Sequence, residues 1–139
     1  PNTLWFTDDL GNDKQLDTAE IMIACSDETT AITSTDTGIK TTLMVPRAMT
    51  VTEVKASLTA ADTGTGFECK VNVHTGDPST STNAMLTADL ILGTDYSASE
   101  TSMSGSYNVL AEDAFINVEV TVADAGAMGL KVYLLGYWS

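Results

Sequence analysis

The run Phe67-Glu68-Cys69-Lys70-Val71-Asn72-Val73-His74 alternates apolar and polar residues at every position. Successive side chains of an extended strand point to opposite faces, so this alternation is typical of a strand with one face in a core. We therefore expect the apolar side chains of this run to enter a core and the polar ones to meet water. The same alternation recurs over residues 116–122 and 130–134. No long stretch shows the apolar spacing of three and four that a helix produces.

Short strands are predicted along most of the chain. Their ranges are 20–25, 29–33, 39–45, 50–60, 67–74, 85–92, 107–111, 115–122 and 129–137. A short helix is an alternative for 85–92, because Ala, Met and Leu favour helices. Val51 and Val54 are three positions apart and would face opposite sides of a regular strand. If both are to enter the core, a bulge near Thr52 is needed. Short strands separated by turn residues predict an all-β fold, namely a single-domain antiparallel β-sandwich of jelly-roll or Greek-key type. The periodicity of the sequence does not define the order of the strands.

The first residues differ from the rest of the chain, because they are polar and acidic and show no core-facing period. We expect residues 1–19 to form an N-terminal arm or irregular edge segment, and residues 20–139 to form the sandwich domain. Trp5 and Phe6 are the aromatic pair of the arm. Aromatic side chains in a polar tail usually dock on another surface, so this pair is predicted to anchor the arm.

Composition limits the possible partners. The chain has 139 residues and 43% hydrophobic residues, which suits one domain with one core. It carries 19 Asp and Glu against 6 Lys and Arg, a net charge of −13. Nucleic acids and anionic membrane surfaces are bound by clusters of Lys and Arg, so neither is an expected partner. The N-terminal residues lack the pattern of an export signal, which predicts folding in a cytoplasm.

Few residues have the pattern of an active site. His74 is the only histidine and no Gly-x-Ser-x-Gly motif accompanies it, so it is expected to be an exposed strand-end residue. The acidic run 8–13 has the oxygen density that calcium favours, but not the EF-hand spacing. Glu20 and residues 112–113 show no sign of sharing the cleft that acid–base catalysis requires. We therefore predict no enzyme activity, no catalytic residue, no metal ion and no cofactor.

Two cysteines, Cys25 and Cys69, each lie in an apolar strand pattern. Small buried thiols are the expected state. A disulfide is the alternative if the two strands face each other, although cytoplasmic folding disfavours it.

The last predicted strand is apolar on both faces. Tyr133, Leu135 and Tyr137 alternate with the residues that face the core. An apolar outer face on a soluble protein often marks an interface, so a contact with another subunit is predicted here. The alternative is a central strand covered by the N-terminal arm. The predicted contact residues are Trp5, Phe6, Tyr133, Tyr137 and Trp138.

Residues 45–59 read Val-Pro-Arg-Ala-Met-Thr-Val-Thr-Glu-Val-Lys-Ala-Ser-Leu-Thr. This segment resembles a pattern of small virion proteins of tailed bacteriophages, namely an apolar residue, Pro, any residue and Ala-Met-Thr, then Val-x-Ala-Ser-Leu. The similarity continues through the strand at 67–74, a Thr- and Ser-rich loop, an acidic turn before an Ile-x-Val-x-Val strand, and the ending Gly-Leu-Lys-Val-Tyr-Leu-Leu-Gly at 129–136. It covers residues 43–137. The insert at 73–86 and the N-terminal arm depart from the pattern.

The resemblance implies a jelly-roll sandwich without catalytic residues, often trimeric, that serves as a capsid decoration or cement protein or as a fibre module. We expect a decoration subunit on the capsid surface of a virion, made in the host cytoplasm. Its expected partners are the major capsid protein and neighbouring copies of itself, as a homotrimer. The alternative is a receptor-binding tip or a head or tail fibre module that contacts the host. Loops 97–106 and 75–83, the latter with Asp77, Pro78 and Ser79, would then carry recognition.

Overall fold

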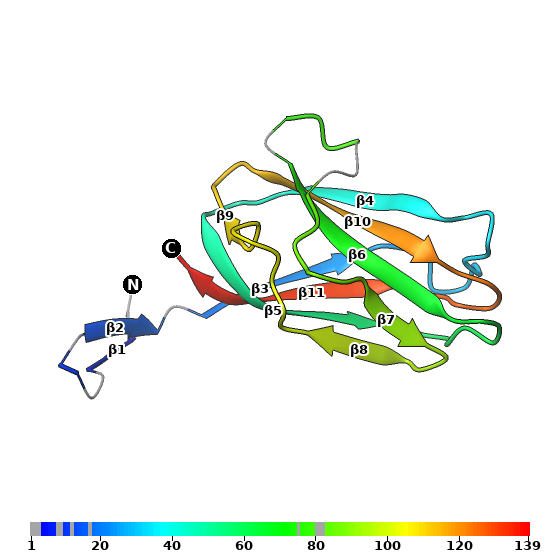
Figure 1. Cartoon of the computed structure of the whole chain (residues 1–139), viewed down its shortest axis with the longest axis horizontal. Coiled ribbons are helices and arrows are strands. Elements are labelled where there is room, and N and C mark those ends of the chain that lie inside the picture. The colour runs from blue at the N-terminus through cyan, green and yellow to red at the C-terminus, as the bar shows by residue number, and fades with distance from the viewer. Residues whose placement is uncertain (1–3, 8–9, 12, 17, 75, 80–82) are drawn as a thin grey trace.

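The computed structural model describes residues 4–7, 10–11, 13–16, 18–74, 76–79 and 83–139 (Figure 1). Within these ranges every element of secondary structure is a β-strand, and no helix that could span a membrane is found there. The strands are β1 Leu4–Thr7, β2 Asp13–Leu16, β3 Thr18–Ala24, β4 Gly38–Met44, β5 Met49–Ser57, β6 Phe67–His74, β7 Leu90–Gly93, β8 Ser97–Glu100, β9 Val109–Leu110, β10 Phe115–Val122 and β11 Lys131–Trp138.

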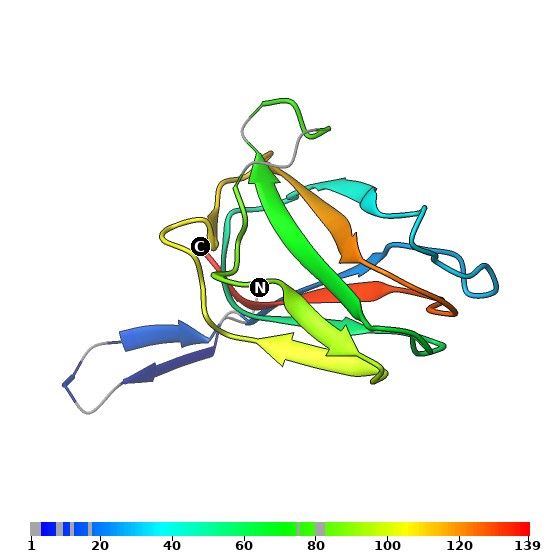
Figure 2. The same cartoon turned by 45° about the vertical axis from the view of Figure 1, so that its right-hand side comes forward.

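Two antiparallel sheets pack face to face to form a sandwich (Figures 1 and 2). One sheet has the order β3-β11-β5-β8, with the short β9 also pairing with β5, and the other has the order β4-β10-β6-β7. The chain crosses to the other sheet at each connection from β3 onward, except those after β6 and β8. Eight strands in two sheets with this order form a jelly roll. The predicted fold class is therefore confirmed, and the structure defines the strand order.

The core lies between the two sheets. The four apolar side chains of β6 are all buried in it, as the alternation predicts. Burying a side chain of Val, Leu, Ile, Phe or Met stabilises the fold by about 1.5–3 kcal/mol. The largest fully buried side chains include Phe67, Met49, Met85, Leu90, Leu110, Ile116, Leu130 and Leu134.

The bulge predicted near Thr52 is present. Leu135 of β11 pairs with Glu53 of β5, whereas the next residue, Gly136, pairs with Val51, so Thr52 is the extra residue. The Thr52 hydroxyl donates a hydrogen bond to the Leu135 carbonyl oxygen at 3.3 Å. A bulge of this kind bends the strand that carries it, and β5 curves strongly in Figure 1.

Four predicted segments differ from the structure. Of residues 107–111, only Val109–Leu110 form a strand, the short β9. Residues 29–33 form no strand beyond one bridge from Ile32 to Ala127, because the carboxylate of Asp27 accepts hydrogen bonds from the backbone of the following threonines. Residues 85–92 form no helix, and only the end of this range belongs to β7. Residues 97–100, expected to lie in a loop, form β8, because their backbone pairs with β5.

The segment before the sandwich is more regular than expected. β1 and β2 form a hairpin with a register that runs from Leu4–Leu16 to Thr7–Asp13. They make up a separate two-stranded sheet, and in Figures 1 and 2 this hairpin projects beyond the sandwich. β3 then begins at Thr18, slightly earlier than predicted.

Candidate functional site

The outer face of the sheet β3-β11-β5-β8 carries two of the five predicted contact residues, Tyr133 and Tyr137. Cross-strand pairing sets Tyr133 of β11 between Met22 of β3 and Lys55 of β5, and it sets Leu135 beside Glu20. Met22 is 54% exposed and Tyr137 is 49% exposed. We call this surface the β11 face and define it by Glu20, Met22, Lys55, Ser57, Tyr133, Leu135 and Tyr137.

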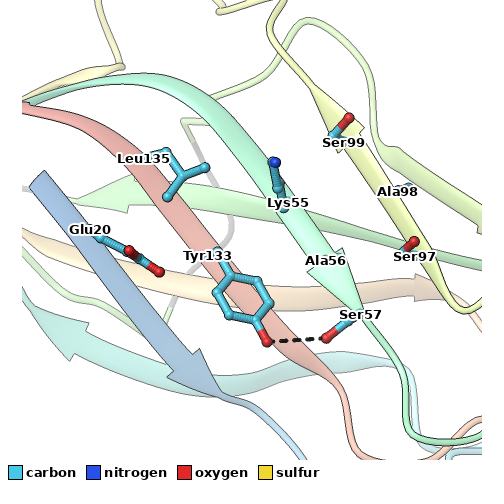
Figure 3. Close-up of a pocket in the computed structure, with 9 residues that line it drawn as sticks. All are labelled: Glu20, Lys55, Ala56, Ser57, Ser97, Ala98, Ser99, Tyr133 and Leu135. Carbon is cyan, nitrogen blue, oxygen red and sulfur yellow. Dashed lines mark hydrogen bonds between the residues drawn. The ribbon is translucent and has the colours of Figure 1, made fainter. Parts of the chain in front are cut away.

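A hollow of about 620 Å³ lies on the β11 face. Figure 3 shows Tyr133 directed toward Ser57, with Lys55 and Leu135 nearby, and the hydroxyl oxygens of Tyr133 and Ser57 are 3.4 Å apart. The residues that line the hollow are Glu20, Lys55, Ala56, Ser57, Ser97, Ala98, Ser99, Tyr133 and Leu135. This mixture of apolar, hydroxyl and charged groups on a sheet surface suits contact with another protein.

Trp138 is placed differently from the two tyrosines. It points toward the interior and packs, partly buried, against the core. The guanidinium carbon of Arg47 lies 5.8 Å from the centroid of its indole ring, within the range of a cation–π interaction. Trp138 therefore supports the fold around the end of β11, whereas Tyr133 and Tyr137 face outward.

The hairpin carries the other predicted contact residues. Trp5 is 57% exposed and Leu10, at the hairpin turn, is 82% exposed. The backbone of Phe6 pairs with Lys14, and the side chain of Phe6 lies outside the part of the structure that is described. Because the hairpin projects beyond the sandwich in both views, it does not cover the β11 face of its own chain (Figures 1 and 2).

The predicted host-facing loop is tied to the outer face of the second sheet. The carboxylate of Asp77 accepts hydrogen bonds from the backbone and the hydroxyl of Ser79, at 2.9 and 2.6 Å, and these bonds lower the pKa of Asp77. The carbonyl oxygen of Pro78 accepts a bond from the side-chain nitrogen of Asn117 in β10 at 2.9 Å. Residues 75 and 80–82 of this loop lie outside the described ranges.

The expected exposure of His74 and Asn72 is wrong, because both are buried, at 4% and 1% exposure. The amide of Asn72 donates to Asn117 and to Glu119, both at 3.0 Å, and Glu119 lies 3.4 Å from the ammonium of Lys70. Neighbouring polar side chains of β10 and the loop at 76–79 thus enclose this end of β6. Sequence alternation contains no signal for such a cover, because it comes from other segments.

The carboxylates considered for acid–base catalysis lie apart from one another in the structure. Glu20 lies on the β11 face, whereas the backbone of Asp113 bonds to Val45 beyond the end of β4. Among the described residues, no group of three or more His, Cys, Asp and Glu could hold a metal ion. Within the acidic run 8–13, Asp8, Asp9 and Asn12 fall outside those residues.

Cys25 and Cys69 are free buried thiols, so the predicted buried state is confirmed and the alternative disulfide is absent. Burial raises the pKa of each to about 12. A thiol reacts as the thiolate, so burial makes both groups chemically inert in the folded chain.

The predicted contact residues therefore lie on two separate surfaces, with Trp5 on the hairpin and Tyr133 and Tyr137 on the β11 face. Met22, Lys55 and the hollow were not predicted, because their place beside Tyr133 follows from cross-strand register. Comparison of this chain with protein-family models, with curated proteins and with solved structures finds no match.

Proposed function

We propose that this chain is a structural protein of a phage virion, a decoration or cement subunit that binds the outer surface of the capsid and stabilises the head. The observation that carries the proposal is the β11 face, where Met22 and Tyr137 remain about half exposed at 54% and 49%. The resemblance of residues 45–59 to small phage virion proteins supports the same function. An apolar outer face on an otherwise acidic sandwich is suited to a protein partner.

The proposed mechanism is mechanical rather than catalytic. β11 lies between β3 and β5 and pairs with both along its length, so the side chains of the β11 face are held on a rigid sheet. Covering them stabilises a complex by about 25 cal/mol per Å² of apolar surface removed from water. Many copies on a capsid lattice link neighbouring subunits, and repeated contacts give strong attachment even when each is weak. The partners proposed are the major capsid protein and further copies of this chain, as a homotrimer.

Charge fits an external position. A net charge of −13 opposes binding to packaged DNA and discourages random association between particles. Specific attachment must then come from a limited surface with less charge. The β11 face carries Lys55 beside Glu20 and the ion-paired Glu53, and apolar side chains lie next to them, so its excess of negative charge is small.

The test is the copy number of this chain in purified particles, measured by quantitative mass spectrometry against the major capsid protein. A copy number close to that of the capsid protein supports decoration. Tyr137→Asp should reduce occupancy on particles at least tenfold, whereas Ile91→Asp, which changes a 64% exposed residue of the other sheet, should not. Absence from particles, or equal occupancy of both variants, would overturn the proposal.

A second candidate function is a receptor-binding tip or a fibre module. The observation that favours it is the loop at 76–79, which projects at one end of the sandwich (Figure 1) and is held by the Asn117 bond to Pro78. A loop fixed to a rigid sheet can present side chains to a host surface. Very few copies per particle, together with lost adsorption to host cells after Asp77→Ala, would favour this function over decoration.

A further inference from the structure

We infer that the β1–β2 hairpin of one copy docks on the β11 face of a second copy. The hairpin forms its own two-stranded sheet, and no strand of the sandwich pairs with it. An isolated two-stranded hairpin is at best marginally stable in water. Trp5 and Leu10 are also largely exposed, at 57% and 82%. The hairpin therefore requires a covering surface.

That surface does not belong to the same copy. β2 ends at Leu16 and β3 begins at Thr18, so a single residue links the hairpin to the sandwich. One residue spans only about 3.5 Å, too little for a hairpin to reverse onto the outer face of the sheet that it leads into. Figures 1 and 2 show the hairpin beyond the end of β3, directed away from the sandwich.

The β11 face has room for an apolar side chain of the hairpin and offers it apolar surface. Its hollow of about 620 Å³ is of the right order to receive a large side chain such as that of Trp5. Met22, Tyr133 and Leu135 provide apolar surface around it. Every copy carries both the hairpin and the face, so each copy supplies the surface that another lacks.

Charge favours the same pairing. Residues 1–17 contain four Asp and one Lys, a side-chain charge of −4 + 1 = −3. In a chain with a net charge of −13, most surfaces repel such a segment. On the β11 face, the ammonium of Lys55 lies 3.6 Å from the carboxylate of Glu53 and lines the same hollow as Glu20, and the side chain of Lys55 remains 48% exposed. The Lys55 ammonium is the cation of this face, and because its ion pair with Glu53 is solvent-exposed and therefore weak, it can also attract a carboxylate of an incoming hairpin.

This contact is heterologous, because two different surfaces meet, and repeated heterologous contacts around an axis close into a ring. The homotrimer expected above is a ring of that type. The inference deepens the proposed function by assigning the β11 face to the contact between neighbouring copies, so that Tyr137→Asp lowers occupancy on particles by breaking the oligomer. It rests on that proposal only for its setting on a virion. Purified protein without capsids is sufficient to test it.

Cross-linking between two single-cysteine variants tests the contact. Thr7→Cys places a thiol on the hairpin and leaves Trp5 intact, and Ser99→Cys places one at the edge of the hollow. The native Cys25 and Cys69 are buried and will not react. The variants are unfolded and refolded together and treated with a short bis-maleimide. We expect a covalent dimer from the mixture and from neither variant alone.

Ser79→Cys is the matched control, because it makes the same Ser-to-Cys change in the exposed loop over the other sheet. Refolded with Thr7→Cys, it should give no dimer. The inference is overturned if the Thr7→Cys and Ser99→Cys mixture gives no dimer, or no more than the control. A dimer from Ser99→Cys alone would also overturn it, because that result requires two β11 faces to meet.

The mass of the purified chain in light scattering provides a second readout. We expect an oligomer for the wild-type chain and a monomer for Trp5→Ala, which removes an exposed side chain outside the core. A monomeric wild-type chain, or a Trp5→Ala variant with unchanged mass, would overturn the inference. Failure of the proposed function is a separate result, in which the oligomer forms but does not bind capsids.

Discussion

The side-chain nitrogen of Asn117 lies 2.8 Å from Nε2 of His74, and both residues are buried in neighbouring strands. The same nitrogen also donates to the Pro78 carbonyl oxygen at 2.9 Å. A carbonyl can only accept a hydrogen bond, which establishes that the nitrogen of the amide faces this way. The second hydrogen of the same amide nitrogen is directed at Nε2 of His74, so Asn117 joins the end of β6 to the loop that follows it.

Asn117→Ala should destabilise the sandwich, because it leaves the buried Nε2 of His74 and the partly buried Pro78 carbonyl oxygen without this donor. A buried polar group left unpaired costs about 1–3 kcal/mol, so a loss of at least this size in the free energy of unfolding is expected. Urea denaturation measures it. Thr42→Ala is the control, since Thr42 pairs with Asn117 across the strands but is exposed. Equal losses in both variants would contradict the role of the amide.

Strand alternation predicts the inner face of the sheet containing β6 and fails on part of its outer face. Parity alone decides which side chains of β6 face the core, so Phe67 and Val71 are predicted correctly. Whether the opposite face meets water depends on what lies above it. Asn72 is buried by contacts with a residue 45 positions later and lies near the loop at 76–79, and neither contact appears in a local pattern.

In the candidate site, too, local alternation predicts which way a side chain faces but not which residues lie beside it. Tyr133 and Tyr137 are predicted to face outward because they alternate with buried residues of β11. Their neighbours follow from register, which joins Met22 to Tyr133 across more than a hundred residues. β8 is a further case, because Ser97-Ala-Ser-Glu100 contains no apolar alternation and its backbone bonds to β5 make it a strand.

The two native thiols should be unreactive until the protein unfolds. Burial raises the pKa of Cys25 and of Cys69 to about 12, and only the thiolate attacks a disulfide reagent. We therefore expect no labelling by Ellman's reagent at about pH 8 in the native state and labelling of both thiols in urea. Ser99→Cys is the control and should add one thiol that reacts at once. Rapid labelling of the native wild-type chain would contradict the buried placement.

Glu28 should make the stability of the sandwich depend on pH. Its carboxylate accepts hydrogen bonds from the Lys131 ammonium and the Thr59 hydroxyl, and these bonds lower the pKa of Glu28 below its ordinary value of 4.5. The unfolded chain therefore binds this proton at higher pH than the folded chain does. The contribution to stability is complete above pH 4.5 and is lost as the pH falls through the lowered folded pKa.

Urea denaturation of the wild type and of Glu28→Gln across this pH range measures the effect. The wild type should be the more stable of the two above pH 4.5, and the difference should shrink as the solution becomes more acidic. In a Lys131→Met background the substitution should have a smaller effect, because the larger cause of the lowered pKa is gone. A difference that does not change with pH would show that the two bonds do not hold the carboxylate.

Gly136→Ala should disrupt the pairing of β11 with β5 at the bulge. A Cβ atom on Gly136 would meet the carbonyl oxygen of Thr50 inside van der Waals contact and the Cα of Val51 at 3.0 Å. Both are backbone atoms of the paired strand, so neither can rotate away. The strands must separate, and such overpacking costs about 1–3 kcal/mol of unfolding free energy in urea denaturation. Gly76→Ala is the matched control, because its Cβ would meet nothing within 4 Å, and its effect should stay within about 0.5 kcal/mol. If the two variants proved equally stable, β11 would not approach β5 as closely as this register requires.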